Sequence, residues 1–290
     1  MQTTYKIRSI KSYRVKRAFL RSVVYVILGA CTIICIAPFV WMLLTSVKST
    51  AEAYRFPPTI IPKKWLWTNY TTGLQKANFL LFFRNTAFVA ILSTIGTVLS
   101  AQYVAYGFSR FKCKGSALFY TLMMATMMLP NQVTLIPQYL LYLKLGMVDT
   151  YLPLLIPAWL GGGAFNIFLF IQFFRTLPKE LDEAAFIDGA STFKTFIHIM
   201  MPSVKPVSLV VLVMSLVHHW NDFFTPLIYI NSTNKFTLAI GLQFLNSSMG
   251  TTKIGQMMAV AVATMIPVLI IFFLAQKYFV QGIKMSGMKD

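Results

Sequence analysis

The sequence predicts an all-α protein that crosses a membrane several times. Of its 290 residues, 57% are hydrophobic and only 12% are charged, and the apolar residues gather in six long runs. Soluble domains carry about 25% charged residues, so much of the usual polar surface is missing here. A helix of about 20 residues crosses a bilayer, and each run is close to that length. Lipid is therefore expected to surround most of the chain.

The six expected spans set the order of the chain. The first is too long for a signal-peptide core and lacks a clear small-residue cleavage site after it, so it is expected to remain as a helix. The first span and a long loop would precede a core of five spans. The spans are 22–45, 86–108, 117–137, 151–174, 207–229 and 255–275, and the expected domains are a basic tail 1–21, the first helix and outer loop 22–78, a core 79–277 with a loop at 175–206, and a tail 278–290.

The basic residues favour one orientation. Six crossings place both ends on the same side, and with the ends inside, the inner segments hold most of the 26 Lys and Arg residues. Cytoplasmic loops carry such an excess. Both termini and loop 175–206 are therefore expected in the cytoplasm. The net charge of +18 is spread over the ends of apolar runs, so it argues for a membrane partner and against nucleic acid.

Three cysteines, Cys31, Cys35 and Cys113, predict neither a disulfide framework nor a metal site. Polar residues inside the expected spans are more informative, because polar groups at membrane depth cost free energy unless they face protein or water. Two readings stay open for them: a translocation path, or a packed cluster near the outer surface. The residues are Asn131, Gln132, Trp220, Asn221 and Asp222.

Half of the eight acidic residues lie in one short stretch of the inner loop: Glu180, Asp182, Glu183 and Asp188. A hydrolase needs an acid and a base, or a metal, in a pocket that excludes water. This loop has no His or Cys at metal spacing. Neither catalysis nor a metal site is therefore expected.

The stretch instead predicts two short helices. Glu180, Asp182 and Glu183 suit the start of the first, where negative charge complements the helix dipole. Leu181, Ala184, Ala185 and Asp188 share one shallow face, against which another chain could lie closely. Gly189 is expected to end the first helix with positive φ, and Ser191 to cap the second. Pro202 is expected to end the segment by keeping Met201 out of the helical region.

These residues also resemble a known motif. Glu183-Ala184-Ala185, three residues, Gly189, nine residues, Ile199, one residue and Met201-Pro202 resemble the EAA loop of ATP-binding-cassette importer permeases, with Met201 in place of Leu. Other stretches resemble the carbohydrate-uptake branch, and within it the smaller six-helix permease of the maltose type. They are 56–62, 84–86, 133–137, 220–223, 226–227 and 278–282.

The resemblance implies a type I importer transmembrane domain in the bacterial inner membrane. Its partners would be a second permease subunit, an ATPase dimer and an external solute-binding protein. The sequence has no G-x-x-x-x-G-K-[ST] phosphate loop, so no cofactor is expected on this chain, and ATP and Mg²⁺ would be bound by the ATPase. The implied ATPase-coupling residues are Glu183, Ala184, Ala185, Asp188, Gly189, Ala190, Phe193, Ile199 and Pro202; the implied binding-protein contacts are Asn246, Ser247, Ser248, Met249 and Gly250.

Two other classes compete with a sugar importer subunit. An ion-coupled secondary transporter would place carboxylates at mid-membrane, but only Asp222 lies inside an expected span. A channel or scaffold subunit would have no ATPase partner. The substrate itself is not readable, although a basic outer loop would favour an anionic oligosaccharide; its basic residues are Lys48, Arg55, Lys63, Lys64, Lys76 and Arg84.

Overall fold

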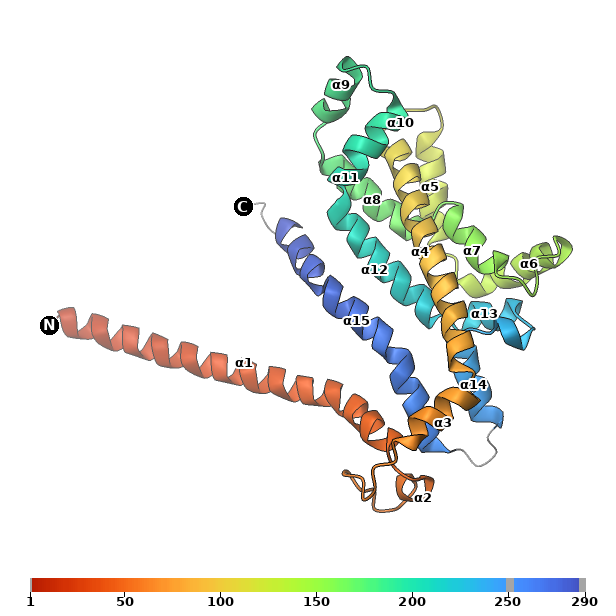
Figure 1. The fold of residues 1–290 in the computed structure, drawn as a ribbon. Helices are drawn as coiled ribbons and strands as arrows, with labels where there is room; N and C mark the ends of the chain where they lie inside the picture. Colours follow the sequence, from red (N-terminus) through yellow and green to blue (C-terminus); the bar gives the residue numbers. More distant parts are fainter. Residues whose placement is uncertain (1, 249–252, 287–290) are drawn as a thin grey trace. The chain divides into compact units, whose positions relative to one another are not determined.

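The computed structural model describes residues 2–248 and 253–286, and these residues form helices and no strand. The all-α class is therefore confirmed. Figure 1 traces the helices in the order of the chain. The α-helices are α1 (Gln2–Ser46), α2 (Thr50–Ala53), α3 (Thr68–Lys76), α4 (Phe79–Arg110), α5 (Ser116–Thr126), α6 (Asn131–Lys144), α7 (Leu152–Trp159), α8 (Ala164–Thr176), α9 (Glu180–Ile187), α10 (Thr192–Thr195), α11 (Met201–Ser203), α12 (Lys205–Asn221), α13 (Phe224–Tyr229), α14 (Leu238–Ser248) and α15 (Ile254–Ser286); η1 (Phe196–Met200) is a π-helix and η2 (Thr233–Lys235) a 3₁₀-helix.

The chain divides into two compact units, residues 1–73 with 251–262 and residues 74–250 with 263–290. In the first unit, the amide of Asn69 on α3 donates to the carbonyls of Ser46 and Lys48, each at 2.9 Å. The first turn of α15 lies against the same place, because a Cβ added to Gly255 would come within 2.6 Å of the Lys48 carbonyl. A glycine is therefore required where the end of α1 meets the start of α15.

Lys48 is an interior residue of this first unit. Only 2% of it is exposed. Its ammonium group donates to the carbonyl of Thr59 and lies 4.7 Å from the centroid of the Trp41 ring. A buried cation needs such partners, because losing its hydration is costly. Lys48 therefore stabilises the loop after α1 and does not belong to an open basic surface.

The second unit is built around α4, which packs against α7, α8 and α12 (Figure 1). Toward its Arg110 end, α4 contributes Ala101, Ala105 and Tyr106 to one apolar cluster with α8, η1 and α12. Toward its Phe79 end, Phe82 and Val89 belong to a second cluster that includes Trp220. Small residues on α4 let its neighbours approach closely, as is common between helices in membranes.

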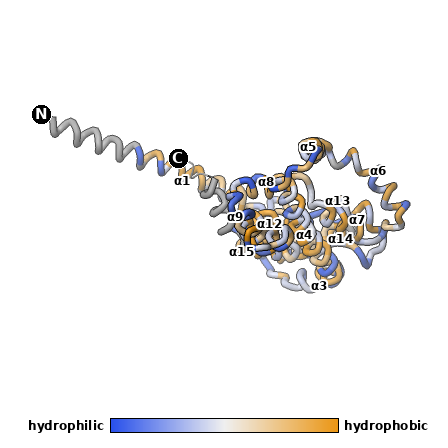
Figure 2. The backbone as a smooth tube through the Cα atoms, turned by 90° about the horizontal axis from the view of Figure 1, so that it is seen from above, coloured by the Kyte–Doolittle hydropathy of each residue, from blue (hydrophilic) through white to orange (hydrophobic). Residues whose placement is uncertain are grey.

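Four helical runs among the described residues are long and apolar enough to cross a bilayer: Phe19–Ser46, Phe79–Arg110, Leu152–Thr176 and Ile254–Leu274. They match four of the expected spans in length and apolar composition. Hydrophobic residues recur along the helices in Figure 2. A fifth results if Thr192–Ser203 and Lys205–Asn221, which meet at an angle of 78°, count as one.

The expected span 117–137 is divided between α5 and α6. Pro130 precedes α6 with an extended backbone, φ −61° and ψ 134°. Proline has no N–H for the helical ladder and disfavours the helical region for the residue before it. The apolar run therefore breaks at Pro130 and forms two shorter helices.

The expected span 207–229 is also divided. α12 ends at Asn221, and Asp222 adopts an extended conformation with φ −66° and ψ 115°. Its Oδ1 accepts the Thr225 N–H at 3.1 Å, which satisfies a backbone donor in the first turn of α13. The break thus sets a carboxylate beside the start of a second short helix.

Candidate functional site

The loop between α8 and α12 folds as the two short helices that the sequence predicts. α9 has Glu180, Asp182 and Glu183 in its first turn. Gly189 has φ +76°, a conformation that glycine adopts without strain. The Ser191 hydroxyl then caps α10 by accepting the Lys194 N–H at 3.4 Å. The stop at Gly189 and the cap at Ser191 are confirmed.

The residues expected to couple to an ATPase differ in their exposure. Ala185 is 3% exposed and faces the chain's own interior, whereas Ala184 is exposed. Leu181, Ala184 and Asp188 are exposed at the predicted helical spacing, but Ala185 is buried, so the predicted face is only partly open to another chain. Glu183, Asp188, Gly189, Phe193 and Pro202 are exposed, and Ala190 and Ile199 are partly buried.

Three large apolar side chains of this helix pair are exposed. Phe186 is 80% exposed, Ile187 83% and Phe193 61%. We call these three residues the apolar tip. α9 and α10 lie together at one end of the second unit, near the Arg110 end of α4 (Figure 1). The sequence analysis missed Phe186 and Ile187, although two large apolar residues just before Asp188-Gly189 were a usable signal.

An ion pair fixes the base of α9 to the end of α4. Arg110 Nε lies 2.8 Å from Asp182 Oδ2, and only 7% of the Arg110 side chain is exposed. The Tyr106 hydroxyl donates to Asp182 Oδ1 at 3.1 Å. Arg110 Nη2 also donates to the Leu177 carbonyl at 3.2 Å. The ion pair and the hydrogen bond from Tyr106 attach α9 to α4 through Asp182, which the sequence analysis had placed only in the helix dipole.

A pocket of about 280 Å³ lies beside this ion pair. Its wall combines charged and aromatic side chains from the end of α4 and from α9, followed by residues of α10. It is lined both by the ion pair at the base of α9 and by Phe186 of the apolar tip. The lining residues are Tyr106, Arg110, Phe111, Lys179, Asp182, Glu183, Phe186, Ala190, Thr192 and Thr195.

The end of the loop differs from the prediction that Pro202 would end the helical segment. Met201 is helical, with φ −61° and ψ −45°, so Pro202 does not end the segment. The chain forms a π-turn at Phe196–Met200, in which the Met201 N–H donates to the Phe196 carbonyl. This wider turn offsets the helical ladder immediately before Pro202, whose ring nitrogen cannot donate. The break falls instead at Val204, where the direction changes by 78°.

The polar residues of the expected path separate into two groups. Gln132 and Asp222 line a pocket of about 540 Å³ in the second unit. Trp220 does not belong to this pocket: it is 5% exposed, its Nε1 donates to the Thr264 carbonyl at 3.4 Å, and its ring meets Phe83 edge-on. Asn221 is exposed and its amide returns to the Val217 carbonyl at 2.9 Å. The side chain of Asn131 lies outside the described residues.

Comparison with known proteins shows which family this helical fold and loop belong to. Residues 94–285 match the family described as binding-protein-dependent transport system inner membrane component. This range is more than half of the chain and includes the whole α9–α12 segment. The chain belongs to this family of transport permeases.

Individual relatives agree with this assignment over most of their length. YurM of Bacillus subtilis, a probable ABC transporter permease protein, is 31% identical over 87% of this chain and 83% of its own. AraQ of Halalkalibacterium halodurans, an arabinooligosaccharides transport system permease protein, is 30% identical over 88% of this chain and 92% of its own. A chain of a bacterial ABC transporter for the acidic polysaccharide alginate shares the fold with a TM-score of 0.80 and 23% identity, over 89% of this chain and 95% of that one.

The expected binding-protein contacts of this permease fall at the edge of the described structure. α14 ends at Ser248, so Asn246, Ser247 and Ser248 form its last turn, and their side chains lie outside the description. Met249 and Gly250 lie outside the described residues altogether. These five positions remain a prediction.

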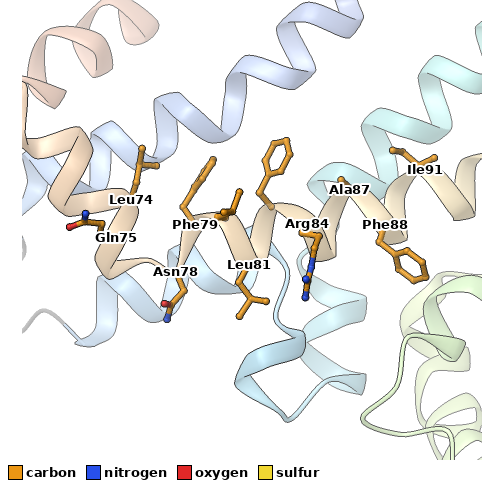
Figure 3. Close-up of a pocket in the computed structure, with 11 residues that line it drawn as sticks. Leu74, Gln75, Asn78, Phe79, Leu81, Arg84, Ala87, Phe88 and Ile91 are labelled. Atoms are coloured by element: carbon orange, nitrogen blue, oxygen red, sulfur yellow. The ribbon is translucent and has the colours of Figure 1, made fainter.

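A larger groove of about 1140 Å³ runs along the beginning of α4. Figure 3 shows Phe79 on one side of α4 and Leu81 and Arg84 on the other. Most of the wall is apolar, as is usual for a helix face that meets lipid. The groove therefore offers few partners for a polar solute. Its lining residues are Leu74, Gln75, Asn78, Phe79, Leu80, Leu81, Phe83, Arg84, Ala87, Phe88 and Ile91.

Proposed function

We propose that this permease is one of two membrane-spanning subunits of an ATP-driven saccharide importer, and that α9 and α10 transmit motion from a separate ATPase. The observation that carries the proposal is the build of the helix pair. Its base is fixed to α4 by Arg110 and Asp182. Its tip exposes Phe186 and Ile187 almost fully. One end is thus attached rigidly to the membrane helices and the other end is open to a partner.

Exposed aromatic side chains of this size commonly dock in a groove of another protein. Burying one large apolar side chain contributes about 1.5–3 kcal/mol. The apolar tip could therefore supply much of the affinity for an ATPase groove, with Glu183 and Asp188 at its polar rim. Closure of an ATPase dimer would displace α9 and, through Asp182, would pull on α4.

The positive-inside distribution supports a cytoplasmic position for this loop and for both termini. ATP and Mg²⁺ would then be bound by an ATPase dimer on the same side of the membrane. A second permease would complete the pathway, and an external solute-binding protein would deliver the solute, in keeping with the binding-protein-dependent family. The contacts with that protein would lie at residues 246–250.

The saccharide class rests on the relatives. AraQ is named for arabinooligosaccharides, and the relation covers 88% of this chain. An oligosaccharide is the proposed class of substrate here. An ion-coupled secondary transporter is not favoured, because the family is binding-protein-dependent and the coupling loop would then have no role.

The test is purification of the tagged full-length chain in a mild detergent with its co-expressed partners, followed by identification of what copurifies. We expect a second permease and an ATPase. Phe186→Asp should weaken retention of the ATPase by about 10- to 100-fold, since 1.4 kcal/mol corresponds to a tenfold change.

The matched control is Phe56→Asp. Phe56 is 93% exposed and lies in the loop between α1 and α3, which is expected outside. This variant should keep the ATPase. If Phe186→Asp and Phe56→Asp retained the ATPase equally, the apolar tip would not be part of the coupling site. If no ATPase copurified with the wild-type chain, the importer proposal would be wrong.

A further inference from the structure

The 540 Å³ pocket of the second unit has several polar side chains in its wall. It lies where α6, α7, α12 and α13 meet the side of α4, and its volume is within the usual range for small-ligand sites, about 300–1,000 Å³. The breaks at Pro130 and Asp222 are what bring these short helices together. Its lining residues are Thr86, Val89, Gln132, Thr134, Leu135, Gln138, Tyr142, Pro153, Leu154, Pro157, His218, His219, Asp222, Phe224, Thr225, Pro226, Ile228, Tyr229 and Thr237.

The amide side chains of this pocket are available to a ligand. In the part of the chain that the structure describes, neither Gln132 nor Gln138 forms a side-chain hydrogen bond, and both are exposed at the pocket. An amide carries two donors and an acceptor. Polar groups among membrane helices are costly without water or a partner. A hydroxyl, which both donates and accepts, would suit these two amides.

Aromatic rings form another part of the wall. Tyr142 meets Tyr229 edge-on with ring centroids 5.4 Å apart, and Tyr229 stacks on Tyr139 at 6.0 Å. Phe224, also in the lining, is 53% exposed. Flat apolar faces beside amides match a molecule with C–H faces and a rim of hydroxyls. That combination describes a saccharide ring.

The charged side chains in the pocket lining indicate which class of saccharide would fit. Asp222 is the carboxylate that lines the pocket, and the described lining includes no Lys or Arg. An acidic sugar would meet a like charge at Asp222, and the basic side chains of the described lining are the imidazoles of His218 and His219, with no ammonium or guanidinium group. Lys48 is buried against Thr59 and Trp41, and Arg84 lines the separate apolar groove, so neither of these two basic residues belongs to the pocket lining.

We propose that this permease carries its own binding site for an uncharged saccharide unit in the pocket formed by Gln132, Gln138, Tyr142 and Asp222. The inference rests on the proposed importer function and deepens it. It assigns part of the substrate recognition to this subunit. It also makes Asp222 a selectivity residue that disfavours anionic sugars.

Binding to the complete purified transporter, without its solute-binding protein, tests this site directly. Saturation-transfer NMR with arabinotriose, maltotriose and raffinose as neutral probes, and with trigalacturonate as the anionic probe, reports contact with the protein. We expect at least one neutral probe to bind and trigalacturonate not to bind. Gln138→Leu should weaken the neutral probe about tenfold, and Asp222→Asn should admit the anionic one.

The matched control is Gln75→Leu, the same substitution in the apolar groove of Figure 3. It should leave binding unchanged. The site would be overturned if the wild-type transporter bound trigalacturonate as strongly as a neutral probe, or if it bound no neutral probe. Equal losses of affinity in Gln138→Leu and Gln75→Leu would also overturn it. ATPase stimulation by the solute-binding protein is measured in parallel. If the wild type lacks it, the importer function fails; if it persists while the probes do not bind, only this site fails.

Discussion

Arg110 Nε lies 2.8 Å from Asp182 Oδ2, and this ion pair joins the last turn of α4 to the first turn of α9. The two residues are 72 positions apart in the sequence. With the bonds from Tyr106 to Asp182 and from Arg110 to the Leu177 carbonyl, the pair forms a rigid connection between the exposed helix pair and the central helix. Displacement of the apolar tip would therefore reach α4 without passing through the bend at Val204.

The first prediction concerns this connection. Asp182→Asn should leave the ATPase attached but reduce coupled uptake, because the tip is unchanged while its attachment to α4 is weakened. Removing one partner of a largely buried charge pair costs about 2–3 kcal/mol. The measurement is uptake of labelled saccharide together with binding-protein-stimulated ATP hydrolysis in proteoliposomes. The variant should lose more of its uptake than of its ATP hydrolysis.

A charge reversal provides the control for that prediction. The double variant Arg110→Asp with Asp182→Arg restores opposite charges but not the bond to Leu177. It should recover part of the uptake lost by either single variant, which a double-mutant cycle measures. Strictly additive losses would show that the two residues do not act through each other.

The second prediction concerns Gly189. A Cβ at this position would meet nothing within 4 Å, so a larger side chain has enough space. Substitution is limited by the backbone, because Gly189 has a φ of +76°. A non-glycine residue there costs roughly 1–2 kcal/mol, and Asn costs less than Leu. Gly189→Leu should reach the membrane but lose coupled uptake, and Gly189→Asn should retain most of it. Uptake by Gly189→Leu equal to wild type would exclude a fixed turn from the mechanism.

The sequence allowed the helical class and the local stops of the coupling loop to be predicted. Gly189 and Ser191 act through their own backbone conformation and immediate neighbours, so their roles follow from local patterns. The exposed tip did not follow, because helical periodicity identifies two possible faces of α9 and cannot say which one the fold buries. Ala185 turned inward, and that left Phe186 and Ile187 exposed.

Contacts between distant segments explain the remaining differences. Trp220 lies beside Asn221 and Asp222 in sequence, but its ring packs on Phe83 and its Nε1 bonds Thr264. Asp222 alone among these three lines the polar pocket. Pro202 is tolerated inside helical structure because the preceding π-turn changes the hydrogen-bond register. None of these arrangements is encoded in residue spacing alone.

The third prediction uses two glycines of α4. A Cβ at Gly96 would lie 2.6 Å from the Trp159 ring, whereas one at Gly107 would meet nothing within 4 Å. Gly96→Ala should destabilise the permease by about 1–3 kcal/mol through overpacking. Gly107→Ala should be neutral or stabilise by up to about 1 kcal/mol through helix propensity. Thermal unfolding in detergent compares them, and similar midpoints for the two variants would contradict the close α4–α7 approach.

The last prediction concerns Asp149, which ties the α6–α7 turn to the segment after α13. The Ser232 hydroxyl and N–H and the Asn231 N–H donate to its carboxylate, and Lys235 lies beside it. The Ser232 bonds, followed by that of Asn231, hold the pKa of Asp149 well below its usual range. A depressed pKa stabilises the fold above the unfolded-state value of about 3.9, and this contribution is lost as the pH falls through the folded-state pKa.

Asp149→Asn cannot accept the same set of bonds, so it should unfold at a lower temperature than wild type at pH 7. The gap should stay constant between about pH 5 and 8 and should narrow below about pH 4. Unfolding midpoints of both proteins across this range check the sign, and a gap that is independent of pH down to 3 would show that the charge of Asp149 is not what ties the two segments.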